Sequence, residues 1–153
     1  MKQRDLVTMT PSEVSELLGS SRKVQIASLN PDGSVHLVTM FYALMEGQIA
    51  FWTYRTSQKA LNLARDPRIT CLVEDGTDYF ELRGVQITGT VRVLEDPSDV
   101  LAIGQLIAAG GLRAGDVAGD TVSEYVAHAA RKRFGYLVEP KRVVSWDHRK
   151  LVT

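Results

Sequence analysis

The alternation of apolar and polar residues predicts a chain built mainly of β-strands. Strands are expected over residues 23–29, 49–54 and 68–74, where the pattern favours an extended chain. The first of them runs into Asn-Pro-Asp-Gly-Ser at 30–34, and an Asp-Gly pair is typical of a hairpin turn. Residues 35–45 follow as a long strand with apolar residues on both faces. We therefore expect core to cover one face of that strand and a ligand or a partner to cover the other.

The longest expected strand covers residues 79–94, and its apolar positions change phase midway. Even-numbered positions are apolar before Arg83-Gly84 and odd-numbered positions after it, which predicts a bulge or a sharp bend at that point. Two short strands are expected near the C-terminal end, over 134–138 and 143–147. Glu139-Pro140-Lys141 is expected to separate them.

Short helices are expected between these strands. A capping box at 10–13, with proline at the first helical position, opens a helix that ends near Gly19. Residues 58–65 are good helix formers and make a second helix. A third runs from about Val100 to Ala109, and a fourth opens at another capping box, 121–124. The glycine-rich stretch Gly110–Gly119 between those two is expected to be a flexible lid or a plain linker.

Hairpins join most of these strands, and the helices fall at strand ends. This order predicts a mainly antiparallel, closed sheet rather than a doubly wound parallel one. The expected fold is mainly β (α+β), a barrel of six or seven strands with peripheral helices. A chain of 153 residues is long enough to bury its own core, so we expect one domain over 1–153.

The stretch from Ala50 to Asp66 has a strand that turns directly into a helix. Such a turn presents unpaired backbone N–H groups and the positive end of the helix dipole. Thr56 or Ser57 can cap the helix, and Arg55 and Lys59 add positive charge. The turn can therefore bind an anion, most naturally a phosphate. The alternative is a polar loop with solvated cations, and no P-loop or GxGxxG sequence accompanies it.

Amino-acid composition bears on the possible partners and on the cellular location. Eighteen basic residues balance eighteen acidic ones, which argues against a nucleic-acid partner bound by charge neutralisation. The lone cysteine, Cys71, lies in an apolar run and is expected to be a buried hydrophobe. One cysteine fits a reducing compartment, and neither a signal-peptide core nor a membrane-spanning run is present, so a cytoplasmic location without membrane association is expected.

No set of residues stands out as catalytic. His36, His128 and His148 lie far apart in sequence without metal-binding spacing, so no metal site is expected. A GxSxG motif is also missing. A phosphate site without acid–base groups is typical of a protein whose bound cofactor performs the chemistry.

Three segments carry a family resemblance. They are QIASLNPDGSVHLVTMFY, GQIAFWTYRTSQKALNLARDPRITCLVEDG and ELRGVQITGTVRVLED. Together they resemble the flavin-binding split β-barrel of the pyridoxamine 5′-phosphate oxidase superfamily, most strongly over residues 24–94. TYRTSQKALNL followed by DPR is similar to the branch whose members commonly use the deazaflavin coenzyme F-420. Some members of that branch use FMN or related ligands.

The resemblance implies a set of cofactor-binding residues. The strand-to-helix turn would bind the cofactor phosphate, and one strand would lie along the ring. Trp52 would face the ring or belong to the core, and Trp146 would lie in a closing segment that approaches the cofactor, often across a dimer interface. The implied cofactor-binding residues are Val38, Thr39, Met40, Trp52, Thr53, Arg55, Thr56, Ser57, Gln58, Lys59 and Trp146.

Two departures from the oxidase pattern bear on the substrate. The oxidase proper carries an Arg and a Lys on the second strand, where this chain has His36 and Phe41. The C-terminal SWDHRK also lacks the oxidase's Arg-x-His motif. Both differences argue against pyridoxamine phosphate as substrate and leave the usual clamp on the FMN phosphate incomplete, although Arg55 could replace it.

The expected function is that of a homodimeric, F-420-dependent oxidoreductase. It would transfer a hydride between the deazaflavin and an unsaturated small organic substrate, with Tyr42, Tyr54 or His148 as candidate proton donors. Two alternatives stay open. One is an FMN-dependent flavoprotein like the pyridoxamine phosphate oxidases, and the other is a non-catalytic carrier of a cofactor, haem or another tetrapyrrole.

Overall fold

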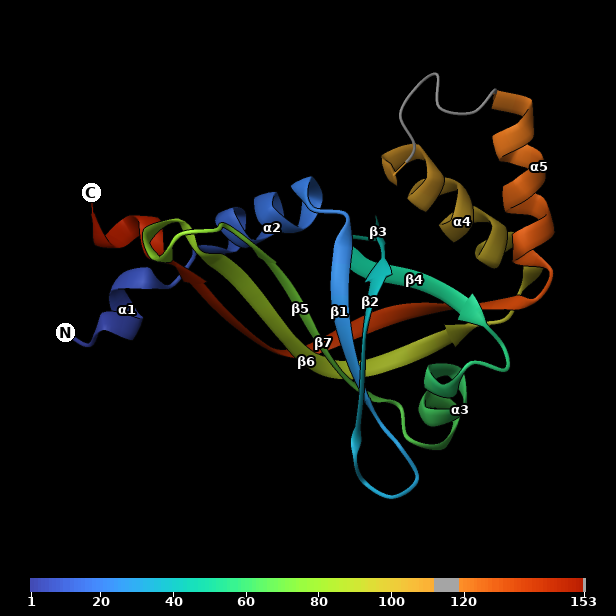
Figure 1. Ribbon diagram of the computed structural model, residues 1–153, viewed down its shortest axis with the longest axis horizontal. Coiled ribbons are helices and arrows are strands. Elements are labelled where there is room, and N and C mark those ends of the chain that lie inside the picture. The colour runs from blue at the N-terminus through green and yellow to red at the C-terminus, as the bar shows by residue number, and fades with distance from the viewer. Residues whose placement is uncertain (112–118, 153) are drawn as a thin grey trace.

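The computed structural model describes residues 1–111 and 119–152, and in this part of the chain seven strands form one curled antiparallel sheet (Figure 1). The strand order is β2-β1-β5-β6-β7-β4-β3. The strands are β1 Lys23–Leu29, β2 Val35–Phe41, β3 Ala43–Met45, β4 Gln48–Tyr54, β5 Arg68–Asp75, β6 Arg83–Leu94 and β7 Arg133–Asp147. The expected split β-barrel is therefore confirmed.

Helices surround this sheet. They are α1 Gln3–Val7, α2 Pro11–Ser20, α3 Gln58–Arg65, α4 Pro97–Gly111 and α5 Gly119–Ala130, with 3-10 helices η1 Tyr79–Glu81 and η2 His148–Leu151. Helices α4 and α5 lie beside each other near one end of β4 and β7, whereas α1 and η2 lie at the opposite end of the sheet (Figure 1). None of the described helices combines the length and the apolar composition needed to cross a membrane.

The long strand expected over 35–45 is interrupted at Tyr42. Strand β2 pairs with β1 at one edge of the sheet, and β3 pairs with β4 at the other edge. Tyr42 joins them and turns inward, where its hydroxyl donates a hydrogen bond to the Leu18 carbonyl (2.5 Å) and its backbone N–H donates to the Arg22 carbonyl (3.0 Å). Residues 35–45 thus connect the two edges of the curled sheet, and these edges do not pair with each other in the strand order.

The barrel core is apolar and includes the expected residues of β1, β4, β5 and β6. Phe51 of β4 stacks on Tyr136 of β7, with ring centroids 5.0 Å apart. Cys71 belongs to this core, and burial raises the pKa of its thiol to about 12. The interpretation of Cys71 as a buried hydrophobe is therefore confirmed.

The expected strand 79–94 begins only at Arg83, because η1 occupies its first residues. The phase change at Arg83-Gly84 marks the start of β6, and no bulge occurs there. The register shift instead lies between Thr88 and Gly89, opposite residues 140–142 of β7. The two short C-terminal strands are accordingly one strand, β7, that passes through Pro140 with an irregularity in its pairing.

Gly89 permits the close approach of β6 and β7 at this shift. A Cβ atom built on Gly89 would lie 2.1 Å from the Glu139 carbonyl oxygen. The contacted atom belongs to the backbone, so it cannot move aside as a flexible side chain would. The irregularity in β7 therefore requires a glycine on the facing strand.

Helices α2 to α5 follow the sequence signals with small shifts at their ends, whereas α1 was not expected from the sequence. The capping box of α2 is present, with Thr10 and Glu13 bonded to each other's backbone N–H. Helix α5 begins at Gly119, before the expected box at 121–124, so that box does not form its start; helix ends commonly differ from a sequence prediction by this much. Of the expected glycine-rich link, Gly110 and Gly111 belong to α4, and residues 112–118 lie outside the described residues.

Candidate functional site

A cavity of about 500 Å³ opens where β4 gives way to α3. The ends of β2, β4 and β7 form one side of it, and α4 and α5 form the other. The residues that line it are Thr39, Met40, Phe41, Trp52, Thr53, Tyr54, Lys59, Gly104, Ile107, Ala108, Tyr125, Val126 and Arg133.

Hydroxyl groups hold the turn between β4 and α3 in shape. The Ser57 hydroxyl caps α3 by accepting a hydrogen bond from the Ala60 backbone N–H (3.2 Å). The Thr53 hydroxyl in turn donates to Ser57 (3.1 Å). Ser57 is thus the N-cap that the sequence indicated as one of two candidates, and this pairing sets the direction in which α3 leaves the sheet.

Asn62 fixes α3 to the β1–β2 hairpin. Its side-chain amide is fully buried and donates to the Ser28 hydroxyl (3.1 Å) and to the Asn30 side-chain oxygen (3.0 Å). Its own oxygen accepts a hydrogen bond from Gln58 (2.9 Å). A buried polar group satisfied on both sides resists displacement. Lys59 is therefore presented to the cavity from a helix that is anchored to β4 through Ser57 and to the β1–β2 hairpin through Asn62.

Among the residues that the structure describes, two cations face this cavity and no acidic residue lines it. Lys59 is half-buried, and desolvation lowers the pKa of its ammonium group below the ordinary range for lysine. The Arg133 guanidinium lies 4.0 Å from the centroid of the Tyr54 ring and 5.0 Å from that of Trp52, and it donates to the Ala129 carbonyl (2.7 Å). The cavity is consequently a positively charged site with aromatic walls.

Trp52 is shared between the core and the cavity. Its ring is half-buried and packs beside Ile103 and Leu137, yet it also lines the cavity. Gly104 of α4 makes room for it, since a Cβ atom there would lie 2.4 Å from two carbons of the ring. Trp52 therefore belongs partly to the core and partly to the cavity lining, and its contact with a cofactor ring stays a prediction.

The structure brings together five of the residues expected to bind a cofactor: Thr39, Met40, Trp52, Thr53 and Lys59 line the same cavity. Ser57 and Gln58 lie at its helix but are engaged in the cap and with Asn62. The other expected residues, Val38, Arg55, Thr56 and Trp146, do not line it.

The side chains of Arg55 and Trp146 contact other parts of the chain. The Arg55 guanidinium lies 4.9 Å from the centroid of the Phe134 ring and lines a separate cavity of about 340 Å³ with Glu95 and Arg131. Trp146 packs on Gly84 near the far end of β7 from Arg133.

Of the three candidate proton donors, one lines the cavity and two lie elsewhere. Tyr54 lines the cavity. Tyr42 is buried with its hydroxyl bonded to Leu18, and burial raises its pKa to about 12. His148 lies by η1, where its Nδ1 is 2.8 Å from the Tyr79 carbonyl oxygen.

Sequence reasoning missed Arg133, Gly104 and Tyr125. Arg133 reaches the cavity because β7 pairs with β4 and sets Arg133 opposite Tyr54. That pairing joins residues about half a chain apart, and the basic run 131–133 before the last strand was the one local signal. Gly104 and Tyr125 enter through the packing of α4 and α5, for which the sequence held no positional signal.

The fold and the cavity define a split β-barrel with a corner suited to an anionic, partly aromatic ligand. The family model described as pyridoxamine 5′-phosphate oxidase matches residues 10–144. The chain belongs to the pyridoxamine 5′-phosphate oxidase family.

Solved structures agree with this family. A conserved hypothetical protein from Mycobacterium tuberculosis, Rv2991, is 37% identical with a TM-score of 0.89, and the match covers 100% of this chain and 94% of that one. An F-420 reductase is 20% identical with a TM-score of 0.61, covering 84% and 94% of the two chains. The haem storage protein HutZ from Vibrio cholerae is 13% identical with a TM-score of 0.65, covering 88% and 94%. The last two show similarity of fold alone. No curated protein matches the chain.

Proposed function

We propose that the protein is an F-420-dependent oxidoreductase that reduces or oxidises an unsaturated small organic molecule. The observation that carries this proposal is the cavity at the β4–α3 turn, which combines Lys59 and Arg133 with aromatic and apolar walls. No acidic residue of the described chain lines it. A ligand with a phosphate and a planar ring fits both halves of that description.

Each part of the cavity would have a distinct role in binding. Lys59 and the start of α3 would hold the phosphate, because the ammonium group and the helix dipole both favour negative charge there. Met40 and Trp52 would border the ring. F-420, when bound, supplies the two-electron hydride chemistry. Tyr54, which lines the cavity, is the candidate among the three tyrosine and histidine donors that could hold a proton near the ring.

Phe41 favours the deazaflavin over FMN as cofactor. It lines the cavity at the strand where the resemblance to the oxidase leads one to expect a cation for the FMN phosphate. The cations near this cavity instead come from α3 and β7. A phosphate clamp that takes no cation from β2 differs from that of the oxidase proper, in line with the TYRTSQKALNL resemblance to the F-420 branch.

Calorimetric titration of the purified full chain with F-420, FMN and haemin tests the assignment. We expect F-420 to bind at least about tenfold more tightly than the other two, a difference of about 1.4 kcal/mol. Tighter binding of FMN would mean that the cofactor is FMN rather than F-420. Tight haemin binding, together with no oxidation of reduced F-420 by a panel of quinones and enones, would instead support a non-catalytic carrier and contradict the proposal.

Affinity for F-420 is expected to fall as the pH rises from neutral to strongly alkaline values. Only the protonated Lys59 ammonium attracts a phosphate, and desolvation has lowered the pKa at which that proton is lost. The loss of affinity therefore begins at lower pH than an ordinary lysine would give. Lys59→Arg should remove this dependence, because a guanidinium keeps its proton throughout the range. The same pH profile in both proteins would exclude Lys59 as the titrating ligand.

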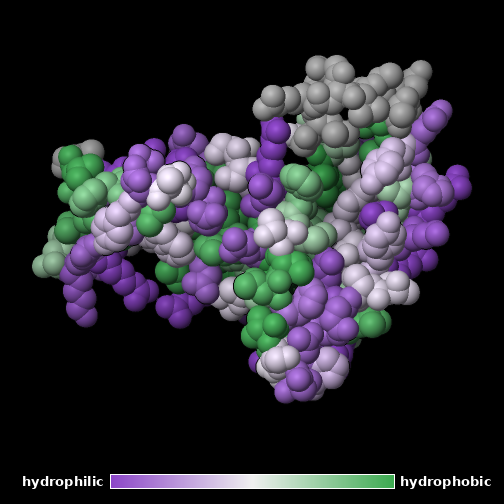
Figure 2. All heavy atoms as spheres, in the orientation of Figure 1, coloured by the Kyte–Doolittle hydropathy of each residue, from purple (hydrophilic) through white to green (hydrophobic). Residues whose placement is uncertain are grey.

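We also propose that the chain forms a homodimer through the outer face of β2. This edge strand exposes Val35 and Leu37 by 61% and 65%, and Phe41, which also lines the cavity, by 53%. In Figure 2 hydrophobic atoms gather over the strands of the β1–β2 hairpin, whereas its tip is hydrophilic. An apolar strip on an edge strand is typical of a surface that another chain covers. Light scattering should give the mass of a dimer for the native chain and of a monomer for Leu37→Asp. A monomeric native chain would contradict the dimer.

A further inference from the structure

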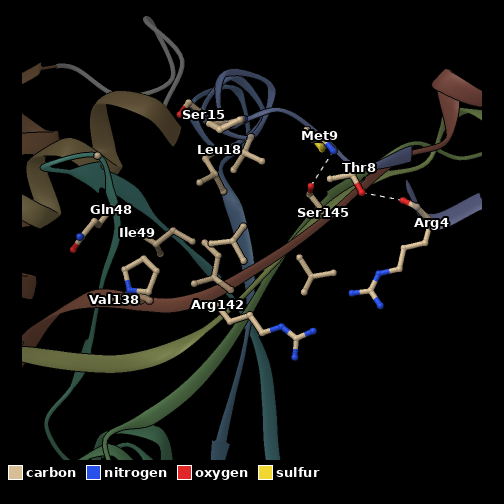
Figure 3. Close-up of a pocket in the computed structure, with 17 residues that line it drawn as sticks. Arg4, Thr8, Met9, Ser15, Leu18, Gln48, Ile49, Val138, Arg142 and Ser145 are labelled. Atoms are coloured by element: carbon tan, nitrogen blue, oxygen red, sulfur yellow. Dashed lines mark hydrogen bonds between the residues drawn. The ribbon is translucent and has the colours of Figure 1, made fainter. Parts of the chain in front are cut away.

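A second cavity, of about 560 Å³, lies between the N-terminal helices and the sheet (Figure 3). The segment joining α1 to α2, helix α2, the start of β4 and the middle of β7 form its walls. It shares no lining residue with the cavity at the β4–α3 turn. The two cavities are therefore separate sites, and the proposed oxidoreductase activity assigns no role to this one.

Hydrogen bonds tie the N-terminal wall to the rest of the fold. The Met9 backbone N–H donates to the Ser145 hydroxyl of β7 (3.0 Å), as Figure 3 shows. Lys150 of η2 donates to the Thr8 carbonyl (3.0 Å) and pairs with Glu13 of α2 (2.8 Å). The wall is thus attached at both β7 and η2, so hydrogen bonds within the fold hold the cavity in shape.

The interior of this cavity is apolar. Leu18, Ile49 and Val138 line it and belong to the barrel core. Val143 of β7 lines it as well and is 48% exposed. An apolar group placed here would extend the core and remove the exposed part of Val143 from water, which is favourable in proportion to the area buried.

Within residues 1–111 and 119–152, Arg4 and Arg142 are the charged residues that line this cavity, and no acidic residue accompanies them. Within the described residues neither guanidinium makes a hydrogen bond or an ion pair. Figure 3 shows both on the same side of the cavity, away from Ser15 and Leu18. Two guanidinium groups without acidic partners, beside an apolar interior, are complementary to a carboxylate attached to an apolar body.

We propose that this cavity binds an anionic amphiphile, a carboxylate carried on an aliphatic chain or an apolar ring. The carboxylate pairs with Arg4 and Arg142, and the apolar body covers Val143 beside the buried Ile49 and Val138. A guanidinium binds a carboxylate through parallel N–H···O hydrogen bonds, which selects the acid over an alcohol of the same length.

Calorimetric titration of the full chain with sodium octanoate and with 1-octanol tests this assignment. We expect octanoate to bind at least about tenfold more tightly than octanol. Arg4→Ala and Arg142→Ala should each weaken octanoate about tenfold, the effect of one charge-assisted hydrogen bond, and leave octanol unchanged. Arg22→Ala removes an exposed arginine that lines neither cavity, so it should leave both affinities unchanged.

Three results would overturn the proposal. The first is a lack of any arginine contribution. It would appear as equal affinity for octanoate and octanol, or as full octanoate affinity in the Arg4→Ala/Arg142→Ala double variant. The second is competition between octanoate and F-420, which would mean that octanoate enters the other cavity. The third is a change of oligomeric state in the double variant, measured by light scattering, with no octanoate binding to the native chain. That result would make this surface an interface between two copies of the chain.

Discussion

The Lys59→Ala/Arg133→Ala double variant is expected to bind F-420 roughly 10²- to 10⁴-fold more weakly than the native chain. Each cation contributes a charge-assisted interaction of about 1.5–3 kcal/mol, and the two lie on different elements, α3 and β7. Arg133 also stacks on the Tyr54 and Trp52 rings, so its loss loosens the aromatic wall as well. Calorimetric titration of the two single variants and the double variant measures the effect.

Arg55→Ala is the matched control for this experiment. Arg55 lies on the same turn as the proposed phosphate ligands, but its guanidinium stacks on Phe134 outside the cavity. We expect this substitution to change F-420 affinity by less than about twofold, a value typical of a charge removed away from the binding site. If Arg55→Ala weakens binding as much as Lys59→Ala does, the phosphate lies on the Arg55 side of the turn and the cavity is assigned wrongly.

Gly89→Ala is expected to destabilise the fold by about 3 kcal/mol or more. The added methyl group would lie 2.1 Å from the Glu139 carbonyl oxygen, and only movement of β6 or β7 could relieve that contact. Because β7 lines both cavities, such a movement would disturb both sites. Urea denaturation followed by circular dichroism measures the change in the free energy of unfolding.

Gly19→Ala provides the comparison for that glycine. Gly19 lies within α2, its backbone needs no left-handed conformation, and a Cβ atom there would meet nothing within 4 Å. Alanine at this position should stabilise the chain by about 0.5–1 kcal/mol through its higher helix propensity. Equal stability of Gly89→Ala and the native chain would show that β6 and β7 do not approach as closely as described.

Most elements of the fold could be predicted from short sequence motifs. The Asp-Gly turn at 32–33, the capping box of α2 and the Ser57 cap of α3 are each decided by a few neighbouring residues, and the structure contains all three. The interruption at Tyr42 could not be predicted in this way. It depends on a hydrogen bond to Leu18, twenty-four residues earlier, which no local pattern encodes.

The contrast between local and long-range determinants also explains which site residues were predicted from the sequence and which were not. Lys59 and Trp52 lie on the strand–turn–helix that the sequence singled out. Arg55 lies there too, yet its side chain turns to Phe134 because β7 runs beside β4. That pairing also delivers Arg133 to the cavity. Sequence patterns located the elements of the site, whereas long-range strand pairing decided which cations face it.

A crystal structure of the chain in complex with F-420 tests the central claim most directly. We expect the phosphate within hydrogen-bonding distance of the Lys59 ammonium group at the start of α3, and the deazaflavin ring beside Met40 and Trp52. A complex in which F-420 occupies the cavity under the N-terminal helices, or in which Lys59 and Arg133 make no contact with it, would contradict the account.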